Sequence, residues 1–434
     1  MLASHVCAAV SGRQSTIGGP VTGFHRDHGV LTCDGLSVAD LARTAGTPGH
    51  LYSGALIAER LQALRAAFAG EHAHIHYAIK ANATLGIVRL LRRLGARADA
   101  NSGGEMEVAL RAGYAPSEIV FTGVGKTAAE LERAVSLGLH AINAESSGEV
   151  ERIAAIARTL GTRARIALRI NPDVDAGTHH HISTGSAVTK FGVTVEQARA
   201  MARAMAGRHE LQLIGLHVHI GSQITKPQPL TEAAQTIADL AREFMAQGHP
   251  LEHLDVGGGL GIAYRAGQPV MTPAEYAAAV LPPVRATGLS LVLEPGRWIV
   301  GPAGIIVTEI VDLKPQPGGR WFVIVDAGMT DLIRPALYSA WHNIEAVSPR
   351  KGPPIICDIV GPVCETSDTL GSERELSPVM VGDLLVVRDT GAYGSVMASN
   401  YNRRPFAAEL MVDEGSPRLI RRRQTIDDML QWDV

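Results

Sequence analysis

The strongest constraint on the fold is an alternation of short apolar runs with longer amphipathic stretches between residues 74 and 294. The runs are about five to eight residues long, which is typical of buried strands. Strands that alternate with helices predict a parallel sheet with right-handed crossovers. Eight strand–helix units is the number that closes a (β/α)8 TIM barrel. The eight predicted strands are His74–Ala81, Ala96–Asn101, Glu118–Gly123, Leu139–Ala144, Ala164–Asn171, Leu213–Ile220, Leu251–Val256 and Leu289–Glu294.

The stretches between the strands are rich in Ala, Leu, Arg and Glu and have helical spacing. An earlier helix is expected over Leu51–Phe68, with Ser53 as its N-cap. An open doubly wound sheet would give the same alternation, so the pattern alone leaves two α/β architectures open. The helices between the strands are predicted at Leu85–Leu94, Glu105–Ala112, Ala128–Leu137, Gly148–Leu160, Val195–Ala206, Leu230–Gln247 and Pro273–Ala286.

Polar residues and glycines at the carboxyl ends of the strands favour the barrel. Barrel enzymes build their active sites at that face and often bind a phosphate in the loops after strands 7 and 8. The glycines at 257–259 would let backbone N–H groups approach an anion, and Arg297 adds a cation. A tight turn is the other explanation for the glycines. The strand-end residues are Lys80, Asp99, Arg169, His217, His219, Asp255 and Glu294.

Lys80 ends the first strand, in the stretch His76–Asn82. Lysine is rarely buried without a partner. Desolvation favours the neutral amine, which is the form that attacks a carbonyl cofactor to give a Schiff base. A solvated lysine at a strand end is the alternative, so the remaining motifs must decide between the two.

After Gly301-Pro302 the sequence pattern changes to runs of β-branched residues separated by Gly and Pro turns. This pattern predicts an all-β domain. The early run Gly29–Cys33 is expected to join it, so a β-sandwich or β-barrel domain would comprise residues 23–45 and 303–434. The barrel would then occupy residues 46–302, after a mobile extension over residues 1–22. Its later strands are predicted at Gly304–Lys314, Arg320–Asp326, Pro354–Val360, Asp383–Arg388 and Ala407–Val412.

Composition excludes several classes of function. A formal net charge of -3 gives no support for nucleic acid or an anionic membrane as a partner. No apolar run approaches the roughly 18 residues of a membrane helix, and no basic segment precedes the short N-terminal apolar patch as in a signal peptide. The four scattered cysteines suggest reduced thiols in a cytoplasmic protein.

A metal-dependent barrel hydrolase is the alternative of a different class. His217 and His219 form an H-x-H pair, and His179–His181 is a run of three. Such a site needs further ligands at the barrel mouth, where Arg297 would be an unfavourable neighbour. We therefore predict no metal.

Several motifs together resemble one family of enzymes, from about residue 25 to the C-terminus and in consistent order. The stretches Tyr77–Asn82, His219–Gln223, Asp255–Gly261 and Glu294–Arg297 resemble the pyridoxal 5'-phosphate (PLP)-dependent decarboxylases of the alanine-racemase fold. The resemblance narrows to the meso-diaminopimelate decarboxylase group through Asp326–Met329, Leu332–Tyr338, Gly361–Glu365, Gly391–Gly394 and Ser399–Pro405.

The resemblance implies a PLP site. Lys80 would hold the cofactor covalently and later return a proton, and His219 would stack on its ring. Glu294 would pair with the pyridine nitrogen and keep it protonated, which deepens the electron sink; related racemases place an arginine there. Asp99 and Arg169 would support the ring. The phosphate would be bound by Ser222, Gly257, Gly258, Gly259 and the backbone of Pro295, Gly296 and Arg297, with Tyr393 closing over it.

The resemblance also implies the reaction, the decarboxylation of meso-2,6-diaminopimelate to L-lysine and CO2, which is the last step of lysine biosynthesis. A PLP-dependent decarboxylase of a related amino acid or conjugate is the alternative. Cys364 would protonate the carbanion; without its Gly-Pro-Val-Cys-Glu context, a buried structural thiol would be the better interpretation. Family members share their sites across a homodimer. The distal end of the substrate would be bound by Arg297, Arg334, Tyr338, Glu365 and Tyr393.

Two departures from the family pattern bear on loops. Thr366-Ser367-Asp368 follows Cys364-Glu365 where a different turn is usual, so that loop is expected to differ. Thr189 replaces a serine before Lys190-Phe191-Gly192.

Overall fold

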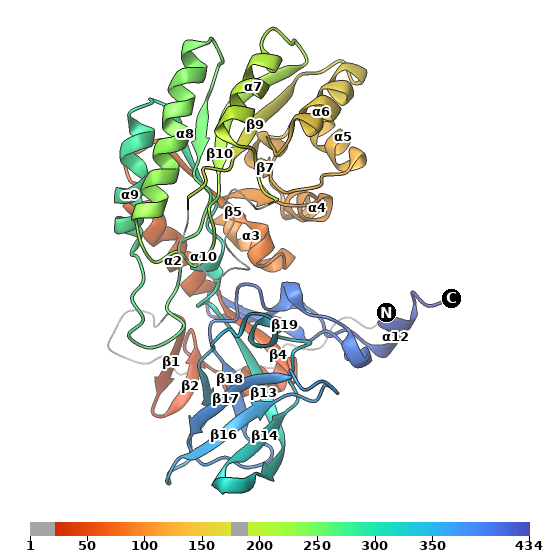
Figure 1. Ribbon diagram of the computed structural model, residues 1–434. Helices are drawn as coiled ribbons and strands as arrows, with labels where there is room; N and C mark the ends of the chain where they lie inside the picture. Colours follow the sequence, from red (N-terminus) through yellow and green to blue (C-terminus); the bar gives the residue numbers. More distant parts are fainter. Residues whose placement is uncertain (1–21, 175–189) are drawn as a thin grey trace.

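The computed structural model describes residues 22–174 and 190–434. The chain forms a barrel of parallel strands wrapped by helices and, beside it, a region built of β-sheet (Figure 1). Of the predicted N-terminal extension only Thr22 is described. The run His179–His181 and Thr189 also lie outside the described residues.

The eight predicted barrel strands are confirmed, and they close on themselves in chain order. The last strand pairs with the first in parallel, Leu291 opposite Ala73, so the sheet has no open edge and the doubly wound alternative is excluded. The strands are β5 (Ala73–Ala78), β6 (Arg97–Ala100), β7 (Ile119–Phe121), β8 (Ala141–Ala144), β9 (Ala164–Ile170), β10 (Leu211–Val218), β11 (His253–Asp255) and β12 (Ser290–Leu293).

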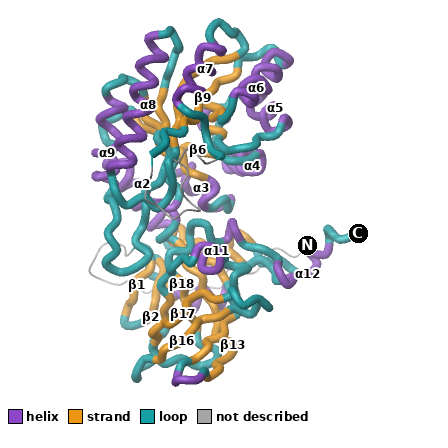
Figure 2. Tube along the Cα trace, viewed as in Figure 1, coloured by secondary structure: helices purple, strands orange, loops and turns teal. Residues whose placement is uncertain are grey.

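Helices cover the outside of the barrel, as Figure 2 shows in purple around the orange strands. Their starts follow from side-chain caps: the Ser53 hydroxyl accepts from the Leu56 N–H, and Thr127 with Glu130 forms a capping box. The helices are α2 (Gly54–Ala67), α3 (Leu85–Arg93), α4 (Gly103–Ala112), α5 (Ala128–Leu137), α6 (Ser147–Thr159), α7 (Val195–Met205), α8 (Gln228–Ala246), α9 (Pro273–Arg285) and the short α10 (Arg297–Val300).

The second region is a nine-stranded sheet centred on the long strand β13 (Gly304–Pro315), which pairs with β4, β14 and β18. Buried Ile, Val and Leu side chains of these strands form its cores. The other strands are β4 (Gly49–Ser53), β14 (Trp321–Val325), β15 (Ile344–Ala346), β16 (Ile355–Val360), β17 (Thr369–Leu376), β18 (Leu384–Val387), β19 (Ala408–Asp413) and β20 (Ser416–Arg421).

The N-terminal part of the described chain differs from expectation in two details. Gly49–Ser53 lies within residues 46–302, which we assigned to the barrel, and its last three residues were expected to begin a helix. The segment is instead a strand that pairs with β13 and β19 and belongs to the nine-stranded sheet, and the helix begins at Gly54. The early run forms β2 (Val30–Cys33), but it pairs only with β1 (Phe24–Asp27) and β3 (Leu36–Ser37) in a separate three-stranded sheet. That small sheet and α1 (Val38–Ala45) pack their apolar side chains onto the nine-stranded sheet.

The barrel strands point their carboxyl ends at the β-sheet region, and direct bonds join the two at this end. The N–H of Tyr393 donates to the carbonyl of Ala81 at 2.8 Å, and the Asn82 amide donates to the carbonyl of Gly391 at 3.1 Å. The turn that carries Lys80 is therefore tied to the loop that carries Tyr393.

The C-terminal segment, with α12 (Ile426–Leu430), projects from the side of the molecule (Figure 1). Ile426, Leu430 and Trp432 are exposed there. None of the described helices is long and apolar enough to span a membrane.

Candidate active site

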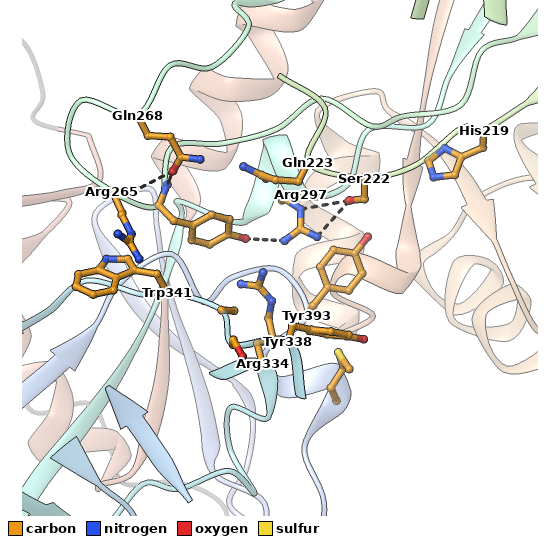
Figure 3. Close-up of a pocket in the computed structure, with 14 residues that line it drawn as sticks. His219, Ser222, Gln223, Arg265, Gln268, Arg297, Arg334, Tyr338, Trp341 and Tyr393 are labelled. Carbon is orange, nitrogen blue, oxygen red and sulfur yellow. Dashed lines mark hydrogen bonds between the residues drawn. The ribbon is translucent and has the colours of Figure 1, made fainter. Parts of the chain in front are cut away.

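A cavity of about 560 Å³ lies where the loops at the carboxyl ends of the barrel strands meet the β-sheet region (Figure 3). It continues inward to a small recess that reaches Lys80 and Glu294. His219, Ser222, Arg297 and Tyr393 line both spaces. The predicted barrel-mouth site is therefore a real cavity, and its outer wall comes from α11 (Arg334–Tyr338) and the loop after it.

Lys80 lies in the 3-10 turn Ile79–Ala81 directly after β5. Its Nζ is 3.4 Å from Oδ2 of the fully buried Asp99 and donates to the Asn101 amide oxygen at 3.2 Å. Burial pulls the pKa of Lys80 down, but the carboxylates of Asp99 and Glu294 outweigh it and raise that pKa above its ordinary value. Desolvation favours the neutral amine here, as we expected, but the two buried acids, which the sequence did not show to be neighbours, stabilise the ammonium more strongly.

Glu294 follows β12 and is buried in the recess. One carboxylate oxygen lies 3.2 Å from His217 Nε2, and the other accepts from the Thr122 hydroxyl at 3.3 Å. Burial raises the pKa of Glu294, yet His217 and Lys80 together hold it below its usual range. The recess therefore contains an ionised carboxylate that is shielded from solvent.

His217, Asp255 and Glu294 form the one group of three described side chains whose possible metal-ligating atoms lie within 4.8 Å of one another. His219 is not a member, so the H-x-H pair does not converge as the hydrolase alternative required. Burial and the charge of Glu294 raise the pKa of Asp255 well above its ordinary value. The two neighbouring carboxyls therefore carry about one negative charge between them.

The glycines at 257–259 form a close-fitting turn beneath the recess. A Cβ on Gly258 would lie 2.3 Å from the carbonyl oxygen of Glu294, and one on Gly257 would lie 2.7 Å from His219 Nδ1. Gly257 and Gly259 also have positive φ angles, 68° and 93°. Only glycine lets the loops after β11 and β12 touch in this way.

Two polar side chains for which the sequence indicated no role hold this turn and the chain just after it. The Tyr276 hydroxyl, from α9, reaches the carbonyls of Gly257 and Gly258 at 3.3 and 3.2 Å. Gln223 bonds the backbone of Ile262 through both ends of its amide. Their hydrogen-bond partners are distant in sequence, so no local pattern reveals them.

Arg297 and Ser222 lie side by side at the mouth of the recess. Nη2 of Arg297 donates to the Ser222 hydroxyl at 3.2 Å, and Nη1 donates to the Tyr264 hydroxyl at 2.6 Å. The guanidinium also lies 4.7 Å from the centre of the Tyr393 ring. The predicted phosphate-end residues are therefore brought together.

Arg334 and Tyr338, one helical turn apart in α11, both line the cavity, as their spacing suggested. Nη1 of Arg334 lies 2.8 Å from Nε2 of His342, and its guanidinium is 4.8 Å from the centre of the Tyr264 ring. Tyr264 and His342 were not among the residues that the sequence indicated.

Cys364 and Glu365 are exposed and line neither space. The Cys364 N–H donates to Asn402 at 3.1 Å, and the Tyr401 hydroxyl donates to Glu365 at 3.2 Å. Asp368, one of the residues that depart from the family pattern, orders this loop by accepting the N–H of Val363 at 2.7 Å. One chain alone thus does not bring this pair to the cavity.

Arg169 and His219 lie near the recess in different ways. Arg169 is buried and ion-paired to Glu145 at 2.7 Å, so it supports the loops rather than pointing free into the cavity. His219 lines the recess and accepts the Gly258 N–H at 3.3 Å. Burial, with the charges of Lys80 and Arg169, lowers the pKa of His219 well below its ordinary value, so the ring is neutral.

Comparison with known proteins agrees with this geometry. Residues 54–301 match the family model described as "Pyridoxal-dependent decarboxylase, pyridoxal binding domain". The diaminopimelate decarboxylase of Pseudomonas aeruginosa is 44% identical over 399 residues, covering 92% of this chain and 95% of that protein. That of Vibrio cholerae is 45% identical over 407 residues, covering 93% and 97%.

Solved structures give the same result. The diaminopimelate decarboxylase of Helicobacter pylori complexed with L-lysine superposes with a TM-score of 0.87 at 40% identity, covering 91% of this chain and 98% of that one. The enzyme from M. jannaschii in co-complex with L-lysine gives 0.90 at 35% identity, covering 95% and 98%. The chain therefore belongs to the diaminopimelate decarboxylase family of pyridoxal-dependent decarboxylases.

Proposed function

We propose that this protein removes CO2 from meso-2,6-diaminopimelate to give L-lysine, with PLP as cofactor and with active sites completed by a second copy of the chain. The observation that carries the proposal is a pair of adjoining spaces: an inner recess with an amine and a buried carboxylate, and an outer cavity with the buried Arg334, with the buried Arg297 lining both. The family comparisons support the same activity.

The residues at the inner end fit PLP. The turn at Gly257–Gly259 is a cradle that a single Cβ would fill, and Ser222 and the backbone of Gly296 line the same recess, which suits a phosphate. Lys80 Nζ suits the aldehyde, and Glu294 suits the pyridine nitrogen. When bound, PLP supplies an electron sink for the electron pair left on the carbon that loses CO2.

The chain's own residues prepare that chemistry. Asp99 and Asn101 fix the direction of Lys80 Nζ, which must give up a proton before it can act as a nucleophile. His217 and Thr122 orient the Glu294 carboxylate, and the low pKa of Glu294 lets it hold a proton on a neighbouring nitrogen rather than on itself. His219 offers a neutral flat ring at the wall of the recess.

The outer cavity selects the substrate's far end. Arg334 and Arg297 present guanidinium groups that fit a carboxylate, and Tyr338 adds a hydroxyl on the same wall. Lysine, ornithine and arginine have no second carboxylate at their far ends for these arginines to bind. For this reason we favour diaminopimelate over lysine, ornithine or arginine as substrate.

Cys364 and Glu365 act from a second subunit in this proposal. Their exposure on one chain supports an arrangement in which they enter the barrel mouth of a partner copy. The Cys364 Sγ would then deliver a proton to the carbon that lost CO2, and Glu365 would meet the substrate's distal ammonium. A homodimer, and a cytoplasmic location as the cysteines suggested, belong to the same proposal.

The cofactor part is tested by visible absorption of the purified protein after incubation with PLP. We expect a band from lysine-linked PLP that is absent in Lys80→Ala and unchanged in Lys226→Ala, a control that replaces an exposed lysine. A band that survives in Lys80→Ala would contradict the assignment.

The substrate part is tested by CO2 release from meso-diaminopimelate, lysine, ornithine and arginine. We expect release from diaminopimelate alone, and a loss of roughly 10- to 100-fold in kcat/KM in Arg334→Leu, because a charged hydrogen bond contributes about 1.5–3 kcal/mol. Comparable release from lysine or ornithine would favour the alternative substrate class.

A further inference from the structure

The two arginines of the outer cavity have no acidic partner. Arg297 and Arg334 are both about 7% exposed, and no carboxylate among the described residues makes an ion pair with either. Buried arginines are ordinarily paired with acids. Asp389 is the acid whose charge reaches Arg334, but it forms no ion pair with it, and burial raises the pKa of Asp389 to about 6.

Arg334 is held instead by a neutral histidine whose tautomer the structure fixes. His342 is fully buried, and its Nδ1 lies 2.7 Å from the carbonyl oxygen of Arg388. A carbonyl can only accept, so Nδ1 carries the proton. Nε2 therefore presents a lone pair, and it accepts from Arg334 Nη1 at 2.8 Å. Burial and the charge of Arg334 lower the pKa of His342 to about 3, so the ring stays neutral.

Arg297 is held by a second neutral group, Tyr264. The Tyr264 hydroxyl accepts from Arg297 Nη1 at 2.6 Å, while its ring faces Arg334 at 4.8 Å. The Tyr264 and His342 rings meet edge to face, 5.2 Å between centres. Tyr264 therefore contacts both guanidinium groups, Arg297 through its hydroxyl and Arg334 through its ring, and His342 accepts a hydrogen bond from Arg334.

We propose that Tyr264 and His342 are positioning residues that hold Arg297 and Arg334 rigid without neutralising them, so that the cavity selects ligands carrying a carboxylate at the end distant from the cofactor. An acid in either place would fix the arginine equally well but would cancel the charge that binds the ligand. A neutral acceptor gives orientation and leaves the positive charge for the ligand. This proposal rests on the proposed function for the identity of the natural ligand, but it concerns binding alone.

Direct binding to the PLP-loaded protein tests it. The probes are pimelate, a seven-carbon dicarboxylate without amino groups, and 1,5-diaminopentane, a diamine without carboxylates, each titrated by calorimetry. The variants are His342→Phe, which keeps a ring but removes the acceptor, and His342→Gln, whose amide can both accept from Arg334 and donate to the Arg388 carbonyl. His253→Gln, in a histidine buried at the other end of the barrel, is the control for losing a buried imidazole.

We expect His342→Phe to weaken pimelate binding roughly 10- to 100-fold, the loss of one charge-assisted hydrogen bond at the site. The variant should retain the PLP absorption band, and diamine binding should stay as weak as in the unaltered protein. His342→Gln should restore pimelate affinity to within about threefold, and Tyr264→Phe should weaken it by less than His342→Phe because the ring over Arg334 remains. With diaminopimelate, the His342→Phe effect should appear mainly in KM.

Three results would overturn the inference. These are pimelate binding unchanged in His342→Phe, failure of His342→Gln to do better than His342→Phe, or an equal loss in His253→Gln. Because pimelate is not decarboxylated, its binding is measured even if the protein releases no CO2 from diaminopimelate. A failure of the proposed function and a failure of this inference therefore give different outcomes.

Discussion

Replacing Gly258 by alanine tests the close contact between the loops after β11 and β12. Gly258 is not among the glycines with a positive φ, so alanine can adopt its backbone conformation and any cost comes from contact alone. The new methyl carbon would lie 2.3 Å from the Glu294 carbonyl oxygen. That distance must open to at least 3.0 Å, and the atom in the way is backbone, which cannot rotate aside.

The size of the effect follows from what must move. Overpacking of this kind costs about 1–3 kcal/mol, which corresponds to a fall in Tm of roughly 2–12 °C for a barrel-sized unit. Either the glycine turn or the backbone of Glu294 must shift, and both belong to the proposed cofactor site. A displacement approaching 1 Å near reacting groups costs on the order of 100-fold in rate. We therefore expect kcat/KM to fall on the order of 100-fold and PLP to bind more weakly, in addition to the fall in Tm.

The assay is thermal unfolding with and without PLP, together with PLP titration by absorbance. Gly148→Ala is the matched control, because the nearest atom to its new methyl is Arg152 Nη1 at 3.8 Å and the residue lies in the first turn of α6. We expect Gly148→Ala to leave the Tm and PLP affinity unchanged or slightly higher. A Gly258→Ala protein with the Tm and PLP affinity of the unaltered protein would refute the argument that only glycine fits the cradle.

Two further predictions concern acid sensitivity and the second subunit. Burial and neighbouring arginines lower the pKa of His140 to about 4. As the pH falls from about 6.5 toward 4, the histidine takes up a proton in the unfolded chain but not in the folded one, so the folded protein loses stability. Between pH 7 and 5, the free energy of unfolding measured in urea should fall by about 1–2 kcal/mol less in His140→Gln than in the unaltered protein. Equal falls in the two proteins would contradict this. If Cys364 acts across a dimer, mixing the inactive Lys80→Ala and Cys364→Ala proteins under conditions of subunit exchange should restore about a quarter of full activity, since half of the dimers are mixed and each has one complete site. No recovery would place Cys364 in its own subunit's site or outside the reaction.

The sequence predicts the barrel well because each strand–helix unit is marked by residues within or next to it. For example, α5 (Ala128–Leu137) is preceded by the capping box of Thr127 and followed by Gly138 in a left-handed conformation, so residues next to the helix mark both of its ends. Gly49–Ser53 was assigned to the wrong region because its partners, β13 and β19, lie more than 250 residues later in the chain. Its own residues continue the helical spacing of the segment that follows, so they indicate neither a strand nor those partners.

The site residues also fall into those that a local sequence pattern reveals and those that it does not. Lys80, Glu294 and Arg297 stand at strand ends and could be found by pattern, since the carboxyl ends of barrel strands share one face. Tyr264 and His342 lie in loops, where no strand or helix pattern points to the hydroxyl of the one or the imidazole of the other as a partner of an arginine. The Tyr264 ring meets Arg334 and His342 only when the two regions come together. The charge of Lys80 was also beyond reach, because it depends on Asp99 and Glu294 lying close enough to outweigh burial.

The most direct test of the account is a crystal structure of the PLP-loaded protein. The account predicts continuous density between Lys80 Nζ and the cofactor, the phosphate in the turn at Gly257–Gly259, and a Glu294 carboxylate oxygen within hydrogen-bonding distance of the pyridine nitrogen. A pyridine nitrogen directed away from Glu294, or a phosphate bound outside the glycine turn, would contradict it.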